Sequence, residues 1–545
     1  MRLRDALRRV VDGLGFPDAE LSLERPRDSG HGDLATNIAM KLAPRMKRPP
    51  REVAHAILER ADLPPDVVTR TEVAGPGFIN FWLAPGALAD VLPRILDAGS
   101  RWGRADKGAG RRVNVEFVSA NPTGPLHVGH GRQAVLGDAI ASLLEATGWN
   151  VTREFYYNDA GAQIMKLARS VQARIRQLRD PSAEFPEDGY HGDYVREVAQ
   201  RYLAANPGDP EGADLERIRR FAVGVMREEQ DRDLQLLGVK FDVYSLESSL
   251  YEKGNVEDTV RRLVAAGHTY EKDGALWLRT TDFGDDKDRV MRKSPDKGGE
   301  YTYFVPDVAY HVTKWERGFT RAINVQGADH HSTVTRVRVG LQALEMGIPE
   351  GYPEYVLHQM VTVMKSGEEM KISKRAGSYI TLRELVQEVG ADAVRYFFLM
   401  RKSESHFVFD VDLATKQSEE NPVYYVQYAH TRMAGIFRTA GIEPERLDAS
   451  GTDLGVLRES EELELLKTLA EFPAVVDVAA ERLEPHRIVA YLEQLAQLVN
   501  GWYHRHRVIG AGEPLERARL VLARAVQIVL ANGLGLLGVT APERM

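Results

Sequence analysis

The chain has 545 residues, of which 43% are hydrophobic and 28% charged, and its net charge at pH 7 is −8. This length predicts three or four compact units of an ordinary globular protein, and the negative charge argues against a general nucleic-acid coat protein. The absence of cysteine excludes disulfides, thiolate metal sites and a cysteine nucleophile, and it fits a reducing compartment.

The N-terminal segment predicts an amphipathic helix, because five apolar side chains share one helical stripe (Leu3, Leu7, Val10, Val11 and Leu14). The segment is rich in arginine, as transit peptides are, but Asp5 and Asp12 interrupt its basic face and no small-residue cleavage site follows. No uninterrupted apolar run approaches membrane-spanning length. We therefore expect a cytoplasmic protein that binds no membrane.

Residues 1 to about 105 mix short helices with one β-like segment, residues 77–83, in which apolar and polar residues partly alternate. An acid-free basic run lies in the same region (Lys41, Arg45, Lys47, Arg48 and Arg51). This run is either a solvated helix face or a contact surface for phosphates. Residues 97–110 are rich in glycine and charge, which predicts a linker.

A βαβ unit is predicted after this linker. Residues 112–118 predict a buried strand and residues 150–157 a second strand. Between them lie a turn punctuated by proline and glycine and a helix that Gly148 ends. The helix carries apolar residues at helical spacing (Val135, Leu136, Ala139, Ile140, Leu143 and Leu144). This order of elements is typical of a nucleotide-binding sheet.

The rest of the chain divides into a mixed part and an all-helical part. Residues 181–214 are polar and punctuated by Pro and Gly, which predicts an insertion with little sheet character, and strands resume at 275–278 and 322–325. From about residue 419, four periodic helices are predicted (423–439, 463–483, 487–504 and 515–537). The expected fold class is α/β: a Rossmann-like parallel-sheet domain (106–418) between an N-terminal α+β domain (1–105) and a C-terminal all-α helical bundle (419–545).

The segment His127-Val128-Gly129-His130 lies where the helix of the βαβ unit begins. Backbone amides of a first helical turn can face an anion, and neutral histidines can donate hydrogen bonds to phosphate. The alternative is that both histidines only pack at the entry of the helix. No GxGxxG or GxxxxGK[ST] glycine loop occurs, so the two commoner nucleotide-binding loops are excluded.

The segment Lys371-Ile372-Ser373-Lys374 places two lysines one helical turn apart between Gly367 and Gly377. Such a loop can close over a nucleotide and neutralise the leaving pyrophosphate, or it can be an ordinary exposed basic loop. Together with the histidine segment, it predicts chemistry at the α-phosphorus of a nucleoside triphosphate.

Two longer stretches make the chain resemble the class I aminoacyl-tRNA synthetases, and within them the arginyl-tRNA synthetase family. They are residues 115–130, VEFVSANPTGPLHVGH, and residues 156–161, YYNDAG. Further matching motifs are residues 30–37, 74–80, 327–331 and 390–396. Departures are small: Val128 replaces the usual Ile of the histidine signature, and Ile372 and Arg375 replace Met and Ser of the lysine signature.

The resemblance implies activation of L-arginine by ATP to arginyl-adenylate, followed by transfer to the 3′-terminal adenosine of tRNA(Arg). It implies that His127, His130, Lys371 and Lys374 stabilise the transition state. The implied ATP-binding residues are His127, Gly129, His130, Asp329, Lys371, Ser373 and Lys374. Asp329 can alternatively be a structural turn residue. Mg²⁺ is expected from the chemistry of ATP, and no protein ligand cluster for a metal is visible in the sequence.

The resemblance also implies an arginine site made of Glu116, Ser119, Asn121, His127, Glu247, Tyr303 and Asp307. A planar guanidinium with five donors requires carboxylates and a rigid acceptor around it. Each of these acids, taken alone, can also be a surface or strand-end carboxylate. Lysine or citrulline would leave buried acceptors unpaired, which can discriminate by roughly 10⁴-fold or more.

The same family binds tRNA through its N-terminal domain and through its helical anticodon-binding domain, and is usually monomeric. Deleting residues 1–100 is therefore expected to weaken tRNA binding while leaving the catalytic fold intact. In the C-terminal part Tyr424, Tyr425, Tyr428, Trp502 and Tyr503 are candidate base platforms, but helical spacing also fits core packing. Two rivals remain, a class I ligase for another amino acid and a non-catalytic RNA-binding paralogue.

Overall fold

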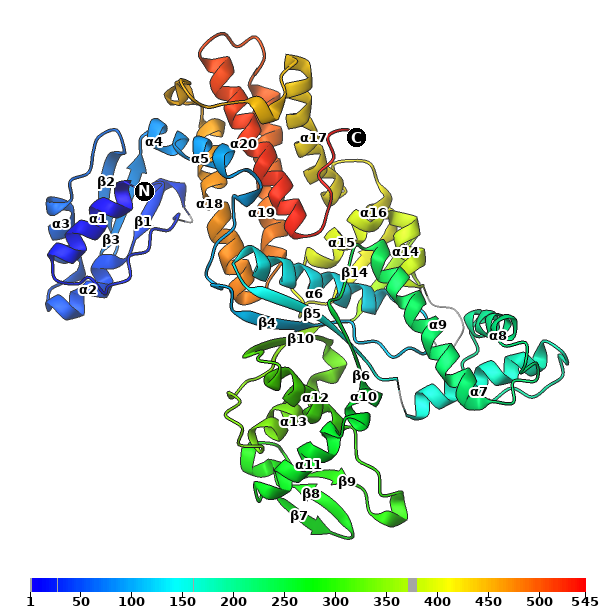
Figure 1. The fold of residues 1–545 in the computed structure, drawn as a ribbon. Helices are drawn as coiled ribbons and strands as arrows, with labels where there is room; N and C mark the ends of the chain where they lie inside the picture. The colour runs from blue at the N-terminus through cyan, green and yellow to red at the C-terminus, as the bar shows by residue number, and fades with distance from the viewer. Residues whose placement is uncertain (1, 27, 160, 371–379) are drawn as a thin grey trace.

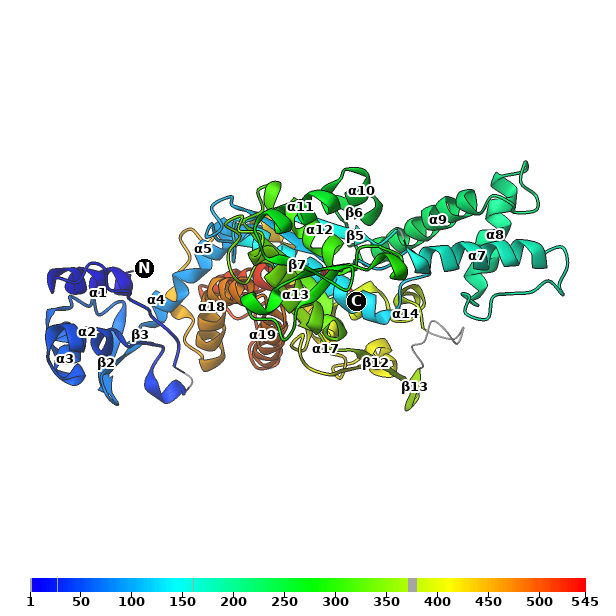
Figure 2. The ribbon, with the colours of Figure 1, turned by 90° about the horizontal axis from the view of Figure 1, so that it is seen from below.

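The computed structural model describes residues 2–26, 28–159, 161–370 and 380–545 of the chain. Figure 1 shows an elongated molecule in which a central sheet lies between a helical bundle and a mixed lobe. The N-terminal unit stands beside the bundle at one end of the molecule. Three helices project at the other end, as Figure 2 also shows.

The N-terminal unit is an antiparallel sheet of order β1-β3-β2 with helices packed on it, an α+β arrangement as expected. The predicted apolar stripe is confirmed, since Leu3, Leu7, Val10 and Val11 are buried in the core of this unit. Its elements are α1 (Arg2–Gly13), β1 (Leu34–Thr36), α2 (Ile38–Met46), α3 (Pro50–Arg60), β2 (Val68–Ala74) and β3 (Phe78–Leu83), the last being the predicted β-like segment.

The central sheet has five parallel strands in the order β11-β10-β4-β5-β6. The predicted βαβ unit is confirmed, because β4, α6 and β5 follow one another and β4 pairs with β5 in parallel. Strand β10 pairs with the edge of β4 opposite to β5, so the order in which strands are added to the sheet changes direction at β4. In sheets of this kind, ligands bind beyond the carboxyl ends of the strands at such a point. The bounds are β4 (Arg112–Glu116), α6 (Val128–Ala146), β5 (Asn150–Tyr157), β6 (Val243–Leu246), β10 (Arg321–Gly327) and β11 (Glu354–His358).

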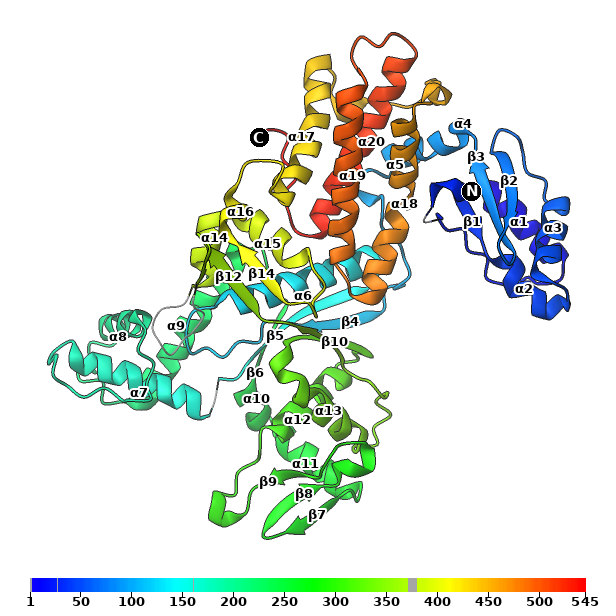
Figure 3. The same ribbon diagram turned by 180° about the vertical axis from the view of Figure 1, so that it is seen from behind.

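The two faces of the sheet are covered differently. Helix α6 lies on the face toward the bundle, and α12 and α13 lie on the opposite face within the mixed lobe, as Figures 1 and 3 show. The predicted strand at 275–278 is β8, which belongs to a separate antiparallel sheet of order β7-β8-β9 in this lobe. The lobe contains α10 (Glu247–Glu252), α11 (Asn255–Ala265), β7 (Thr269–Lys272), β8 (Ala275–Leu278), β9 (Arg289–Arg292), α12 (Phe304–Glu316) and α13 (His331–Gln342).

The projecting arm consists of α7 (Ala162–Gln177), α8 (Asp193–Ala205) and α9 (Leu215–Leu236), which enclose a small core of their own. The predicted insertion at 181–214 lies here and contains helix α8 but no strand, in agreement with its sequence. A second small sheet, of order β13-β12-β14, lies beside the N-terminal part of α6, where the Arg132 guanidinium lies over the Phe407 ring. Its surroundings comprise β12 (Val361–Lys365), β13 (Glu368–Met370), α14 (Leu382–Val389), α15 (Ala391–Leu399), β14 (Phe407–Asp410) and α16 (Val411–Thr415).

All four predicted C-terminal helices are confirmed: α17 (Pro422–Ala440), α18 (Ser460–Arg482), α19 (His486–Arg505) and α20 (Leu515–Leu536). They share one hydrophobic core with the central sheet. Helix α20 is long and apolar enough to cross a membrane by composition, but 67% of its most apolar window is buried within the fold. It is therefore the core helix of the bundle.

The segment between the N-terminal unit and β4 packs with the bundle. It contains α4 (Pro85–Ala89) and α5 (Val91–Ala98), and Leu92 and Ile95 of α5 are fully buried in the central core. The core of the N-terminal unit, in contrast, ends at Phe81. Ion pairs join this unit to α18: Arg25 pairs with Glu464 and Glu471, and Asp33 with Lys467.

Helix α15 carries a buried arginine where three parts of the chain meet. The Arg395 guanidinium is 2% exposed and donates to the carbonyl oxygens of Leu237, after α9, and Leu537, after α20, each at 2.8 Å. It also pairs with Asp138 of α6 at 2.6 Å. A side chain at Gly538 would collide with this guanidinium. One cation thus joins the arm, the bundle and the helix that follows β4.

Candidate active site

His127 is the N-cap of α6, directly beyond the carboxyl end of β4. Its Nδ1 accepts a hydrogen bond from the amide of Gly129 at 3.1 Å, and the amide of His127 donates to Nδ1 of His130 at 3.3 Å. This reciprocal arrangement is a capping box built from two imidazoles. It fixes both rings at the positive end of the helix dipole, where a phosphate is stabilised.

The two imidazoles stack, with ring centroids 3.7 Å apart and an interplanar angle of 20°. A Cβ at Gly129 would lie 3.0 Å from the His127 ring, so glycine gives the ring the space that capping requires. The structure therefore brings His127, Gly129 and His130 together as one rigid unit.

Lys371, Ser373 and Lys374 lie outside the described residues. The chain on their C-terminal side returns to the histidines, because His127 forms a β-bridge with Thr381. In addition, the amide of Leu382 donates to the carbonyl of Leu126 at 2.8 Å. Thr381 caps α14 in a second capping box with Glu384.

Glu116, Glu247 and Asp307, hereafter the acidic cluster, come from three separate elements. Glu116 ends β4 and Glu247 begins α10, and both are buried; Asp307 lies in the first turn of α12 and is half-buried. Burial, followed by the charges of Glu247 and Glu116, raises the pKa of Asp307 to about 7, against an opposing effect of Arg336. Such mutual influence requires the three carboxylates to be close together.

The members of the cluster differ in their partners. Glu116 pairs with Lys314 of α12 and accepts from Ser119 Oγ at 2.9 Å. Glu247 accepts from the Tyr156 hydroxyl at 3.0 Å, and burial raises its pKa. In the described part of the chain, the Asp307 carboxylate forms no hydrogen bond or ion pair. Two of the three acids thus lack a paired cation.

Sequence reasoning missed Lys314 and Tyr156. Lys314 is fully buried and binds Glu116 and Asn324 Oδ1, the latter at 3.0 Å. Strand register explains this contact, since Asn324 stands opposite Glu116 in neighbouring strands. Tyr156 lies within the quoted YYNDAG motif, which was a signal, whereas nothing local marked Lys314.

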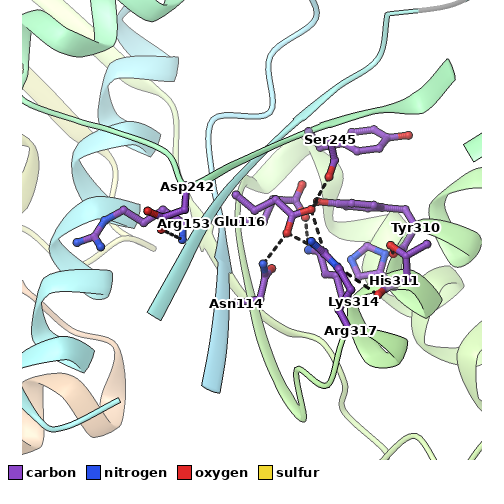
Figure 4. Close-up of polar contacts among 12 residues, drawn as sticks. Asn114, Glu116, Arg153, Asp242, Ser245, Tyr310, His311, Lys314 and Arg317 are labelled. Carbon is purple, nitrogen blue, oxygen red and sulfur yellow. Dashed lines mark hydrogen bonds and ion pairs between the residues drawn. The ribbon is translucent and has the colours of Figure 1, made fainter. Parts of the chain in front are cut away.

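A second buried network lies next to the cluster, on the same face of the sheet. Glu154, which stands opposite Glu116, is fully buried and accepts hydrogen bonds from Asn114, Ser245, Tyr310 and Arg317. Burial acts to raise its pKa, but the charges of Lys314 and Arg317 lower it overall. Figure 4 shows the side chains of Tyr310, Lys314 and Arg317 converging on β4, the strand that carries Asn114 and Glu116.

The network also fixes the protonation of His311. Burial, and then the charge of Lys314, lower the pKa of His311 to about 3, so the ring is neutral. Its Nδ1 donates to the carbonyl oxygen of Asp307 at 2.8 Å, and its Nε2 accepts from Asn324 at 2.8 Å. The first turn of α12, which carries Asp307, is therefore held to the sheet by hydrogen bonds.

The remaining predicted residues are placed less tightly. Ser119 has a left-handed φ of 41° and also accepts from the Tyr156 amide at 3.2 Å, so it joins the cluster. Asn121 donates to Gln163 at 2.9 Å. Tyr303, the N-cap of α12, is 68% exposed. Asp329 follows β10 and its exposed carboxylate lies 3.7 Å from His330.

The basic run of the N-terminal unit is mostly neutralised, since Lys41, Arg45 and Arg48 pair with Glu20, Asp18 and Glu52. This pairing favours the solvated-face interpretation for that run. In the bundle, Trp502 is fully buried and hence a core residue. Tyr428 and Tyr503 instead flank Arg432, whose guanidinium lies 4.4 and 5.2 Å from their ring centroids.

Three family models match successive parts of the chain. The arginyl tRNA synthetase N-terminal domain matches residues 1–83, and the catalytic domain of class I tRNA synthetases (R) matches residues 92–432. The DALR anticodon binding domain matches residues 426–545.

Similar proteins agree with these models. The arginine–tRNA ligase of Geotalea daltonii is 56% identical over 542 residues, which covers 97% of this chain and 95% of that protein. The arginine–tRNA ligase of Geobacter metallireducens is 56% identical over 538 residues, covering 96% and 94%. The solved Thermus thermophilus arginyl-tRNA synthetase shares the fold, with a TM-score of 0.76 at 24% identity, covering 100% and 99%.

Proposed function

Because this chain belongs to the arginyl-tRNA synthetase family and is an arginine–tRNA ligase, we propose that the acidic cluster binds the guanidinium of arginine and the histidine pair binds ATP. The enzyme activates L-arginine with ATP and transfers the arginyl group to tRNA(Arg). In the first step the arginine carboxylate attacks the α-phosphorus of ATP and pyrophosphate leaves. In the second, a ribose hydroxyl of the terminal adenosine takes the arginyl group.

The observation that carries the arginine assignment is the charge balance of the acidic cluster. Glu116 has Lys314 as a partner, whereas Glu247 and Asp307 have no ion pair within the described residues. A buried and a half-buried carboxylate without a counter-charge are costly unless a cation binds between them. A guanidinium supplies that cation together with planar donors for both acids.

The rest of the arginine substrate would contact residues near the end of β4. Ser119, Asn121 and Glu116 are proposed to bind its α-amino and carboxylate end, next to His127. Tyr303 is exposed at the start of α12, where it can cover the bound side chain.

For ATP, we propose that His127, Gly129 and His130 bind the triphosphate through the imidazoles and the first amides of α6. Lys371, Ser373 and Lys374 are proposed to neutralise the leaving pyrophosphate, with His127, His130, Lys371 and Lys374 as the catalytic group. Thr381 supports this arrangement, since it follows Lys374 by seven residues and bridges to His127. Asp329 would contact the adenosine.

Mg²⁺ is proposed to accompany ATP. Among the described residues no group of three acidic or histidine side chains could hold a metal ion, so the cation would bind mainly through the phosphates. No step of the reaction is derived through it. The enzyme is further proposed to be monomeric and cytoplasmic.

For tRNA, we propose the division 1–105, 106–418 and 419–545 into a tRNA-contacting, a catalytic and an anticodon-binding domain. The arrangement in Figure 3 supports it, because the N-terminal unit and the bundle stand beside each other as separate parts next to the catalytic sheet.

The test is ATP–pyrophosphate exchange with arginine, lysine and citrulline, each with and without tRNA(Arg). Asp307→Ala should raise the arginine KM by two orders of magnitude or more and reduce discrimination against lysine, because a buried charged hydrogen bond is lost. Asp296→Ala, which removes an exposed acid of the same lobe, is the matched control. Unchanged discrimination in Asp307→Ala would refute the assignment.

A further inference from the structure

Tyr156 lies in β5, next to the acidic cluster but outside the set of residues proposed above to bind arginine. Its hydroxyl donates to Glu247 Oε2 at 3.0 Å, and its backbone amide donates to Ser119 Oγ at 3.2 Å. Its ring packs on Tyr310 with centroids 4.3 Å apart. One residue therefore connects the two ends of the proposed arginine site.

The surroundings of this phenol are acidic. Burial, and then the charges of Glu247, Asp307 and Glu116, raise the pKa of Tyr156 strongly, so the hydroxyl keeps its proton. That proton is directed to Glu247, which leaves the lone pairs of the phenol oxygen as acceptors. Tyr156 thus presents a neutral acceptor within a group of carboxylates.

We propose that Tyr156 is a specificity-determining residue, which fixes the Glu247 carboxylate and accepts a hydrogen bond from the guanidinium of arginine. This inference rests on the proposed function of the acidic cluster. The Tyr156 hydroxyl occupies Oε2 of Glu247, so Oε1 and the Asp307 carboxylate remain for the ligand.

The chemistry of competing side chains follows from this arrangement. Guanidinium has five donors and no acceptor, so it can satisfy Glu247, Asp307 and the phenol oxygen together. Citrulline places a carbonyl oxygen where one of these donors would be, and this oxygen would face an acceptor. Lysine has donors at a single nitrogen and cannot reach all three groups in one plane.

Tyr156→Phe is the direct test, because it removes one oxygen and preserves the ring that packs on Tyr310. We expect the arginine KM to rise about tenfold in pyrophosphate exchange with tRNA present, and discrimination against citrulline to fall by a similar factor. The ATP KM should stay within about twofold, since Tyr156 is outside the set of residues proposed to bind ATP. A general structural defect would instead change all parameters.

Tyr157→Phe is the matched control. It makes the same change at the next residue, whose buried side chain points to the opposite sheet face and packs on Phe155. Its arginine KM should stay unchanged.

Glu247→Gln separates the two levels of inference. If Glu247→Gln raises the arginine KM and Tyr156→Phe does not, the role of Tyr156 is refuted and the acidic cluster stands. If neither variant changes the arginine KM, the proposed cluster itself is refuted and the role of Tyr156 with it.

Discussion

Lys314 and Glu116 form a buried ion pair on the inner face of the parallel sheet, 198 residues apart in the chain. Asn324, opposite Glu116 in the neighbouring strand, completes the coordination of the ammonium group. The pair neutralises one acid of the acidic cluster, and the other two have no ion pair within the described residues.

Lys314→Met should reduce the free energy of unfolding by roughly 3–5 kcal/mol, because it leaves the Glu116 carboxylate buried without a counter-charge. Lys314→Met combined with Glu116→Gln should recover a large part of this loss. Urea denaturation followed by circular dichroism measures both variants. A double variant as unstable as the single one would show that packing, and not charge, is what Lys314 provides.

Arginine binding should depend on the ionisation of Asp307. Burial, followed by the charges of Glu247 and Glu116, raises the pKa of this carboxyl to about 7. The guanidinium requires the ionised form, so the arginine KM should rise as pH falls below 7, by up to about tenfold for each further pH unit. Pyrophosphate exchange between pH 6 and pH 8 measures this change. In Asp307→Asn the KM should be high at every pH in that range; a wild-type KM that is flat across it contradicts the prediction.

The Asp307 carboxyl affects the free energy of unfolding in the opposite direction: higher pH favours arginine binding but lowers the stability of the ligand-free fold. Its pKa is about 7 in the folded protein and near 3.9 when unfolded, so the folded state binds the proton more tightly. The contribution of this group to the free energy of unfolding is therefore fully present near pH 4 and below, and it is lost as pH rises toward 7. Asp307→Asn should therefore stabilise the ligand-free protein at pH 8 by on the order of 2 kcal/mol and have no such effect at pH 4, as measured by urea denaturation.

The capping of α6 by His127 can be separated experimentally from its proposed contact with ATP. His127→Asn keeps a good capping acceptor, so the unfolding free energy should change little while exchange falls by about 10²–10³. His127→Ala should lose a further ~1 kcal/mol of stability. Full pyrophosphate exchange activity in His127→Asn would refute the ATP contact and show that His127 only caps the helix.

The site of truncation should decide what is lost from the N-terminus. Deleting residues 1–83 removes a unit with its own core, whereas deleting residues 1–100 also removes Leu92 and Ile95 from the central core. The shorter deletion should weaken tRNA(Arg) binding in a filter assay and leave the thermal midpoint of the remaining chain nearly unchanged. The longer one should lower that midpoint by several degrees. Equal tRNA affinity with and without residues 1–83 would contradict the proposed role of this unit.

Local sequence pattern predicted the elements of the fold well. Strand β5 has exactly the predicted residues, 150–157, and the four bundle helices differ from prediction by a few residues at their ends. These elements have strong apolar periodicity, and their glycines and prolines mark the ends. The antiparallel sheet that contains β8 was not predicted, although its strands are neighbours in sequence and the Asp273-Gly274 turn between β7 and β8 is a hairpin signal.

The acids of the candidate site were found through motifs, but their partners were not. Lys314 lies in the last turn of α12 and Asn324 in the middle of β10, and neither position marks a site in the local sequence. Their contact with Glu116 arises only when β10 pairs with β4 in one particular register. Trp502 shows a second limit of sequence analysis. Its helical spacing was compatible both with a buried core ring and with a ring that faces RNA, and the structure buries it.

The Arg395 guanidinium has a mechanical consequence, because it caps the ends of two long helices while paired to Asp138 of a third. Moving any one of these helices away would leave backbone carbonyls without their hydrogen-bond donor or leave a buried charge without its partner. None of the helices can therefore pivot alone at this junction. The bundle and α6, which carries the histidine cap, are therefore coupled through this one side chain. The N-terminal unit, in contrast, joins α18 through the partly exposed ion pairs of Arg25, which salt weakens.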